Sequence, residues 1–367
     1  MKNNFLLPKY MPPDFSKSNF VNAPIVKTEH TTEDGIAPEN YHSTSNHPEY
    51  IHITKEKWIL LPDSRMDAVI VVKGDKIEVK EFRNLKKDES VVIGRTENGE
   101  EGIYVHTTGF DISDNRSYDK FAFRTRGTRE TPFSRSYDDL YKLLKHEKYN
   151  GFIVWVLGPA VAFDKDSRHA MQTLVENGYC HALMAGNALA THDLEAAYFH
   201  TGLGQDIYTQ LLQPMGHYNH LDIINKVRSI GSIKNSIKKL NIKDGIIYAC
   251  EKTGIPYVLC GSIRDDGPLP EVIANVYKSQ DTMRSFAKKA TTVIAMATQL
   301  HSIAFGNMLP SYKIEENGNV RKVFMYVVDI SEFSADKLAN RGSSQAIPIV
   351  TNAQDFIINL HNNLNLV

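Results

Sequence analysis

The chain is 367 residues long, with 42% hydrophobic and 23% charged residues, which is the composition of an ordinary globular protein with one large domain or two. Its formal net charge of −1 provides no field to attract nucleic acid or an anionic membrane, so neither is expected as a partner. No run approaches the roughly 20 apolar residues of a membrane span, and the N-terminus lacks the pattern of a signal peptide.

The three cysteines have no paired metal-ligand spacing, and such sparse use is typical of a reducing compartment. We therefore expect a soluble, cytoplasmic protein without a bound metal.

Residues 1–48 are polar and interrupted by prolines without a sustained period, and they are predicted to form an extended or partly disordered arm. Residues 49–134 contain short runs rich in β-branched and aromatic residues, which predict a small antiparallel β-rich domain. The first of these runs are Ile51–Ile53, Lys57–Leu61, Ala68–Val72 and Lys76–Phe82.

Two hairpins are predicted in this domain. The Gly-Asp pair at 74–75 separates two of the runs above and is typical of a tight turn. The Asn-Gly pair at 98–99 predicts a second hairpin, between Val91–Ile93 and Ile103–Val105.

Residues 135–367 are predicted to form an α/β domain. A helix is expected over Asp138–His146, and apolar runs then alternate with helical segments, as in a doubly wound sheet. The predicted strands are Phe152–Leu157, Ala182–Met184, Tyr257–Leu259, Thr292–Met296, Val323–Val328 and Ala346–Val350. Ligands of such sheets bind at the carboxyl ends of the strands, so the residues that follow each strand are the candidate site.

Small or polar residues follow the first two of these strands. Gly158-Pro159-Ala160 is not a G-x-G-x-x-G motif, and it is either an ordinary loop or a place where a phosphate approaches the backbone. After the second strand, Asn187 is either a ligand for an amide or ribose hydroxyl or a helix cap. His192 and Asp193 are titratable groups just inside the next helix.

The loop from Cys260 to Pro270 carries the strongest signal. Arg264 is suited to hold a substrate carboxylate, and Asp265 and Asp266 to bind ribose or act as a base. The alternative is an Arg-Asp salt bridge that fixes a turn, and Cys260 is more simply a small buried hydrophobe than a nucleophile.

Two further strand ends carry candidates for a dinucleotide. Thr298–His301 follows one strand, and Asp329 closes the next, where a carboxylate commonly binds adenosine ribose and favours NAD over NADP. The alternative for Asp329 is a helix N-cap. Arg341–Gln345 and Thr351-Asn352 are expected to close over the dinucleotide.

His217 and His220 lie outside the strand ends, three residues apart, and resemble half of a metal site. Because no neighbouring ligand completes it, we expect them to hydrogen-bond a substrate or a neighbouring subunit.

Four segments together resemble a known family. They are AGNALATHD at 185–193, GHYNHL at 216–221, YVLCGSIRDDGPLP at 257–270 and ATQLHSIAFGNMLPS at 297–311. They are similar to the archaeal-type ornithine cyclodeaminases, a family also described as the lysine-ketoglutarate reductase/saccharopine dehydrogenase bifunctional-enzyme conserved region. The resemblance extends over roughly residues 150–367.

This resemblance implies a deoxyhypusine-synthase-like Rossmann-type NAD-binding domain, a homo-oligomer, and conversion of L-ornithine to L-proline and ammonia. By position it places NAD against Asn187, Ala188, Asp266, Thr298, Leu300, His301 and Asp329. We assign the substrate carboxylate to Arg264 and the base to Asp265, with His217 or His220 as the rival base.

Two departures from the family pattern are noted. No segment resembles the arginine-dihydrolase domain fused to some relatives, so ornithine would be supplied from elsewhere. Residues 125–134 also differ from the archaeal pattern, which would change the substrate if they contribute to its pocket.

Two other functions remain open at this point. One is an NAD-dependent amino-acid or opine dehydrogenase on the same scaffold, which would release NADH. The other is a non-catalytic NAD-binding regulatory protein, which would not need the charges of Arg264, Asp265 and Asp266.

Overall fold

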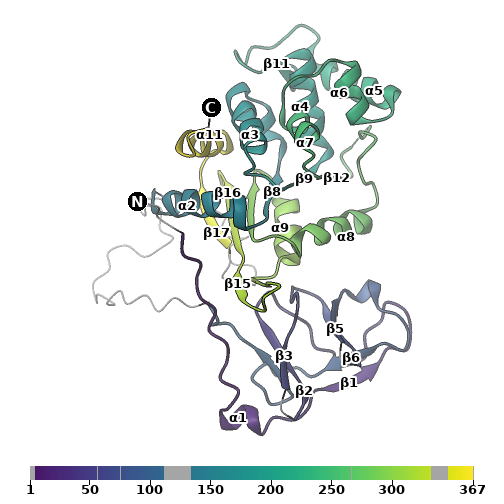
Figure 1. The fold of residues 1–367 in the computed structure, drawn as a ribbon. Helices are drawn as coiled ribbons and strands as arrows, with labels where there is room; N and C mark the ends of the chain where they lie inside the picture. Colours follow the sequence, from purple (N-terminus) through teal and green to yellow (C-terminus); the bar gives the residue numbers. More distant parts are fainter. Residues whose placement is uncertain are drawn as a thin grey trace.

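The computed structural model describes residues 5–55, 57–74, 76–110, 134–265, 267–331 and 346–366. The antiparallel strands of the first third lie at one end of the molecule, and most helices of the second part lie at the other (Figure 1). Helices α8 (Val276–Ala287) and α9 (Gln299–Met308) lie between the two groups.

The β-rich part consists of two antiparallel sheets. One has the order β1-β6-β4-β5 and the other the order β3-β2-β7. Their strands are β1 (Lys27–His30), β2 (Glu49–Thr54), β3 (Lys57–Leu60), β4 (Val69–Lys73), β5 (Lys76–Lys80), β6 (Ser90–Ile93) and β7 (Ile103–Val105). The short helices are α1 (Ser18–Val21) and η1 (Phe82–Asn84). The first predicted hairpin is confirmed, because β4 and β5 pair from Val69 with Lys80 to Lys73 with Lys76.

The second predicted hairpin is wrong. Its turn does form, with the N–H of Gly99 donating to the carbonyl of Ile103, but the strands on either side of it belong to different sheets. β6 pairs with β1 and β4, whereas β7 pairs with β2. The chain leaves β6 at Gly94, where φ of +135° favours glycine, so the two strands diverge before the turn.

β1 comes from the segment predicted as an arm, where no strand is expected from the sequence. All four of its residues are exposed, which is why no alternation of apolar residues marks this edge strand. Earlier in the same segment, Phe15 stacks on Trp58 at a centroid distance of 4.9 Å. This segment therefore packs on the β-rich part through its aromatic residues.

The second part is built on a six-stranded parallel sheet, as predicted. Its strands are β8 (Ile153–Leu157), β9 (Ala182–Gly186), β12 (Tyr257–Cys260), β13 (Thr292–Met296), β16 (Phe324–Asp329) and β17 (Ala346–Val350). Their order is β12-β9-β8-β13-β16-β17, which is 3-2-1-4-5-6 when they are numbered along the chain. This is the Rossmann order, and the direction of winding reverses between β8 and β13.

Helices cover both faces of this sheet. Ile153, Trp155 and Leu157 of β8 face one core, and Val154 and Val156 face the other, because side chains alternate along a strand. The first core is covered by α2 (Ser134–Asn150), α3 (Lys165–Glu176), α4 (Asn187–Phe199), α5 (Asn219–Ile230), α6 (Ile233–Lys239), α7 (Ile246–Thr253) and α11 (Ala353–Asn363). The second core is covered by α8 and α9.

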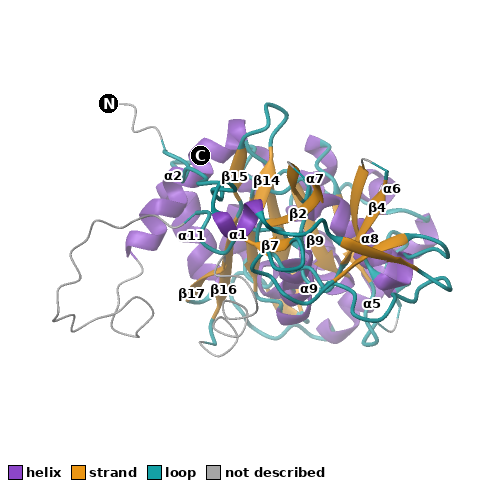
Figure 2. Ribbon diagram, turned by 90° about the horizontal axis from the view of Figure 1, so that it is seen from below, coloured by secondary structure: helices purple, strands orange, loops and turns teal. Residues whose placement is uncertain are grey.

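The remaining elements are short. They are η2 (Pro159–Ala162), β10 (Thr201–Gly202), β11 (Gln205–Asp206), η3 (Gly216–Tyr218), β14 (Tyr312–Ile314) and β15 (Val320–Lys322). Helices α2 and α11 lie side by side (Figure 2), and the rings of Tyr137 and Phe356 are 5.8 Å apart between them. Over the described ranges, no helix has the length and apolar character needed to cross a membrane.

A hydrogen bond at the amino end of β8 predicts that the stability of the fold depends on pH. Nδ1 of His181 accepts a hydrogen bond of 2.8 Å from the N–H of Ile153, so this nitrogen must be unprotonated, and burial lowers the pKa of His181. Because the unfolded state then binds the proton more readily, stability is complete above about pH 6.5 and declines as the pH falls toward the folded pKa.

We expect the decline to contribute at most about 1.4 kcal/mol per pH unit for this group. His181→Asn keeps an acceptor and removes the titration, so urea unfolding of this variant between pH 7.5 and 5 should show a shallower decline. If the free energy of unfolding of this variant declined as steeply with falling pH as that of the wild type, His181 would not contribute to the pH dependence.

Candidate active site at the carboxyl edge of the parallel sheet

The two strands at the reversal point are held together at their carboxyl ends. The N–H of Gly158, which follows β8, donates to the carbonyl of Met296 in β13 at 2.9 Å. A Cβ at Gly158 would collide with the carbonyl oxygen of Ala297, so only glycine fits this contact. Ala297 itself has φ of +57°, in the left-handed region that glycine favours. This tightly built junction is where a doubly wound sheet binds its ligand.

Two helices begin at this edge, and in both the N-cap residue makes no side-chain hydrogen bond to the first turn. α4 starts directly after β9 with Gly186 as its N-cap, and α9 starts after β13 with Thr298 as its N-cap. The first N–H groups of an α-helix have no partner within the helix and carry a partial positive charge. The edge therefore offers two groups of donors of the kind that bind a phosphate, which fits the pyrophosphate of a dinucleotide.

Five of the predicted cofactor residues lie in or next to these first turns. Asn187 and Ala188 are the first two residues of α4, and Thr298, Leu300 and His301 begin α9. The Leu300 side chain is 76% exposed, so an apolar surface is available there for a ligand.

Asn187 also has a structural contact. Its Oδ1 accepts a hydrogen bond of 3.0 Å from the N–H of Leu269 and one of 3.4 Å from Oγ1 of Thr191. Because Asn187 is buried and Leu269 lies in the loop after β12, this side chain fixes that loop against the start of α4.

His301 brings three strand ends together. A Cβ at Gly186 would lie 3.1 Å from its Cε1 and 3.6 Å from the carbonyl oxygen of Cys260, so the ring lies over the ends of β9 and β12. Burial lowers the pKa of His301, and the carboxylate of Asp265 opposes this shift. A lowered pKa keeps the imidazole neutral at pH 7, when one ring nitrogen can accept a proton.

The charged loop after β12 forms a turn. Oδ2 of Asp265 accepts a hydrogen bond of 2.8 Å from the N–H of Ser262, whose carbonyl accepts one of 3.1 Å from the N–H of Asp265. Arg264 is exposed at the tip of this turn. Cys260 is buried, and burial raises the pKa of its thiol, so its environment is that of a packing residue. Asp266 lies outside the described residues.

Asp329 ends β16, one strand beyond β13. Its Oδ1 accepts a hydrogen bond of 2.8 Å from the N–H of Ser331, and its carbonyl accepts one of 3.1 Å from the N–H of Thr351. The side chain is half-buried at the same edge as the helix starts. The predicted loop Arg341–Gln345 lies outside the described residues.

A second polar cluster surrounds Glu195, a residue that is not among the predicted site residues. Its carboxylate is fully buried and accepts hydrogen bonds of 2.8 Å from both Nδ1 of His192 and Oγ1 of Thr201. The N–H groups of Leu203 and Gly204 also donate to it. The one signal in the sequence was the i, i+3 spacing of His192 and Glu195 on a helix.

The predicted residue His220 belongs to this second cluster. Its ring centroid lies 6.1 Å from that of His192, which in turn contacts Phe163 at 5.0 Å. Phe163 directly follows η2, and η2 begins at the residue after Gly158, so the cluster contacts the segment that leaves the reversal point. His217 is exposed on η3 and contacts Tyr218 instead.

Asp193 has a structural environment rather than an open one. It is 1% exposed, and Oδ1 accepts a hydrogen bond of 2.7 Å from Nε of the buried Arg168. The N–H groups of Ile246 and Ile247 donate to the same carboxylate, which therefore caps α7. This titratable group connects α3, α4 and α7.

Comparison with known proteins agrees with this architecture. Residues 139–360 match the family model described as "Arginine dihydrolase ArgZ-like, C-terminal, Rossmann fold". A protein of Methanocaldococcus jannaschii named ornithine cyclodeaminase is 39% identical over 340 residues, which are 90% of this chain and 76% of that protein.

Solved structures are similar over nearly the whole chain. The crystal structure of a conserved putative LOR/SDH protein from Methanococcus maripaludis S2 has a TM-score of 0.83 at 35% identity, over 93% of this chain and 98% of that one. The ternary complex of AgrE with ornithine and NAD⁺ has a TM-score of 0.57 at 28% identity, over 94% of this chain and 46% of that one. The chain therefore belongs to the archaeal-type ornithine cyclodeaminase family, which shares its Rossmann-fold domain with the ArgZ-like proteins.

Proposed function

We propose that this protein is an NAD-dependent enzyme that converts L-ornithine to L-proline and ammonia. The observation that carries the proposal is the extent of the family match, because archaeal relatives named ornithine cyclodeaminase are 36% to 39% identical over about nine-tenths of this chain. The Rossmann strand order and the starts of α4 and α9 at the carboxyl edge of the sheet support the same function.

We place NAD at the carboxyl edge of the parallel sheet. The N–H groups at the starts of α4 and α9 bind its pyrophosphate, and Asp329 binds ribose hydroxyls. The further contacts in this proposal are Asn187, Ala188, Asp266, Thr298, Leu300 and His301. When bound, NAD⁺ accepts a hydride from the substrate and later returns it, so that it is recycled.

The substrate chemistry is balanced without an outside oxidant. Oxidation at the α-carbon of ornithine gives an imine, the side-chain amine adds to that carbon, and the α-amino nitrogen leaves as ammonia. Reduction of the resulting cyclic imine at the same carbon gives proline. The sum is ornithine to proline plus ammonia, with no net change in oxidation state.

The protein must hold the carboxylate and move protons between the two amines. Arg264 holds the substrate carboxylate, because a guanidinium offers two parallel donors to it. Asp265 removes the proton from the attacking amine, supported by its position beside the neutral His301. His220 is the rival base, because it lies beside the His192–Glu195 pair, whereas the exposed His217 is the weaker candidate.

The amount of NADH formed per proline tests this function. The pure protein is incubated with NAD⁺ and L-ornithine while proline, ammonia and NADH are followed together. Proline and ammonia in equal amounts, with no accumulation of NADH, are expected. Stoichiometric NADH would identify a dehydrogenase, and NAD binding without turnover of any diamino acid would favour a regulatory protein.

We also propose that the protein is a homo-oligomer, with an apolar patch on residues 203–221 as its contact surface. Leu203, Tyr208, Leu211, Leu212 and Met215 are all more than half exposed, up to 80% for Leu212. This segment includes β11, which lies at the end of the molecule farthest from the β-rich part (Figure 1). Such a concentration of exposed apolar side chains is typical of an interface between subunits.

Charges in this patch should separate the subunits. We expect the wild type to have a mass in light scattering that is a multiple of 41.4 kDa, and the double variant Leu211→Asp, Leu212→Asp to have that of one chain. Val21→Asp, at an exposed apolar residue of α1, is the control and should remain oligomeric. A monomeric wild type, or an oligomeric double variant, would contradict the proposal.

A cytoplasmic location is proposed as well. It is supported by Cys180, Cys250 and Cys260, which are all free and buried, as in proteins of a reducing compartment.

A further inference from the structure

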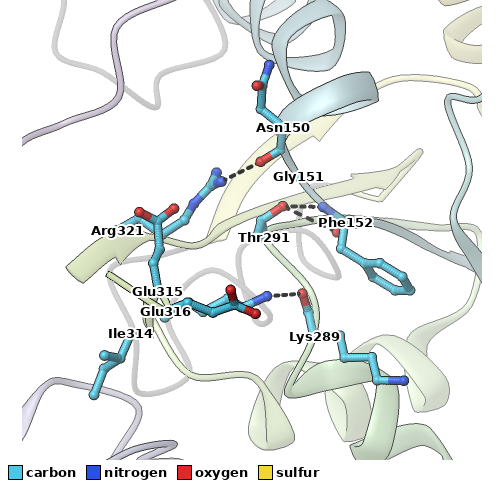
Figure 3. Close-up of a pocket in the computed structure, with 10 residues that line it drawn as sticks. Asn150, Gly151, Phe152, Lys289, Thr291, Ile314, Glu315, Glu316 and Arg321 are labelled. Carbon is cyan, nitrogen blue, oxygen red and sulfur yellow. Dashed lines mark hydrogen bonds between the residues drawn. The ribbon is translucent and has the colours of Figure 1, made fainter. Parts of the chain in front are cut away.

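A cavity of about 410 Å³ lies at the amino edge of the parallel sheet, opposite to the proposed NAD site. One wall is formed by Gly151 and Phe152 before β8 and by Thr291 before β13, and the other by the β14–β15 hairpin (Figure 3). Its volume is in the range of about 300 to 1,000 Å³ that is usual for small-molecule sites.

A buried guanidinium closes one end of this cavity. Arg321 is 5% exposed, and its Nη2 donates to Oε1 of Glu147 at 2.7 Å while its Nη1 donates to the carbonyl of Asn150 at 3.1 Å. Among the described residues, its Nε has no hydrogen-bond partner. A buried donor without a partner is costly, but Nε has no surface open to the cavity, so Arg321 contributes positive charge to the lining rather than a free donor.

Lys313 adds positive charge to the lining. Nζ of the half-buried Lys313 donates to the carbonyl of Lys289 at 3.0 Å. Burial chiefly lowers the pKa of Lys313, with Arg321 adding to this shift and the carboxylates of Glu315 and Glu147 opposing it. The side chain of Lys289 is exposed and extends away from the cavity (Figure 3), with its Nζ 5.7 Å from the centroid of the Phe286 ring.

The hairpin supplies the opposite charge. Glu315 and Glu316 line the cavity from the hairpin (Figure 3). A site lined by both ammonium and carboxylate groups matches a ligand that carries both charges close together.

We propose that this cavity binds a free α-amino acid, with the carboxylate of the ligand toward Lys313 and its ammonium group toward Glu315 and Glu316. This site is separate from the catalytic edge, and the inference does not depend on the proposed function. The cavity lies where the hairpin meets the amino ends of β8 and β13.

The test is a binding measurement on the full chain without NAD. Each of the twenty standard L-amino acids is titrated by calorimetry, and at least one is expected to bind. Lys313→Met and Glu315→Gln should each weaken that binding at least about tenfold, since each removes one charge-assisted contact. Glu315→Gln keeps the size of the side chain and the backbone hydrogen bonds of the hairpin turn, so it tests the site even if Lys313→Met folds poorly.

Two controls locate the site. Lys239→Met, on the exposed face of α6, and Arg264→Ala, in the proposed catalytic loop, should both leave the binding unchanged. The proposal is overturned if no amino acid binds, if both cavity variants bind normally, or if only Arg264→Ala abolishes the binding. In that last case the amino acid occupies the proposed catalytic site, whose own function the assay of cofactor balance decides separately.

Analogues of the best amino acid test the pairing of charges. The analogue without its amino group and the amide without its carboxylate should both bind at least about tenfold more weakly. Equal binding of the deaminated analogue would show a simple anion site and contradict the assignment of Glu315 and Glu316.

Discussion

Asp193→Ala is expected to lower the free energy of unfolding by about 3 to 5 kcal/mol, because it leaves the buried guanidinium of Arg168 without its closest partner. The carboxylate of Asp193 accepts hydrogen bonds from Nε of Arg168 and from the first N–H groups of α7. The same substitution therefore removes an ion pair and a helix cap in the centre of three packed helices. Urea unfolding followed by circular dichroism measures the loss.

Two variants separate the charge from the packing. Asp193→Asn keeps an acceptor oxygen in a side chain of the same size, and we expect it to lower the free energy of unfolding by less than Asp193→Ala does. Asp166→Ala removes an exposed carboxylate from the first turn of α3 and should cost less than about 1 kcal/mol. A loss of less than about 1 kcal/mol for Asp193→Ala would show that Asp193 is not the structural connection described here.

Arg264→Ala is expected to raise the KM for L-ornithine by about a hundredfold, while the Kd for NAD⁺ changes less than about twofold. The reason is that a bidentate, charge-assisted pair with a substrate carboxylate contributes about 2 to 3 kcal/mol. Arg264 is exposed on the turn that Asp265 and Ser262 form, so its removal should leave the fold intact. Steady-state kinetics and calorimetric titration of NAD⁺ measure the two effects.

Arg264→Lys is the matched variant. It keeps the positive charge but loses the two parallel donors, so we expect a KM between those of the wild type and Arg264→Ala. An unchanged KM in Arg264→Ala would remove Arg264 from the substrate site. A parallel loss of NAD⁺ affinity would place it against the cofactor instead.

The parallel sheet could be predicted from sequence because its strands are mostly apolar, with few polar positions such as Thr292 and Asp329. Ile153–Leu157 and Thr292–Met296 are buried at every position, so their composition alone marks them as central strands. The pairing of Val91–Ile93 could not be predicted, because its partners come from Lys27–His30 and Val69–Lys73. A local turn signal says nothing about partners so distant in the chain.

Residues of the candidate site could be predicted separately, at the end of each strand, but their contacts with one another could not. Asn187, Thr298 and Asp329 were singled out because each follows a strand, but no pattern predicted that His301 lies over Gly186. Glu195 was missed because a carboxylate inside a helix usually faces solvent, and only its donors from the β10–β11 segment reveal its burial. The structural role of Asp193 could not be predicted either, because its partner Arg168 lies 25 residues away in the chain.

The most direct test of the account follows a single hydrogen. L-ornithine with deuterium at the α-carbon is turned over with unlabelled NAD⁺, and the proline formed is analysed by mass spectrometry. If the cofactor at the carboxyl edge takes this hydrogen and returns it to the same carbon, the proline carries one deuterium at that carbon and no reduced cofactor accumulates. Unlabelled proline, or deuterium that collects in reduced cofactor, would contradict the mechanism proposed for this enzyme.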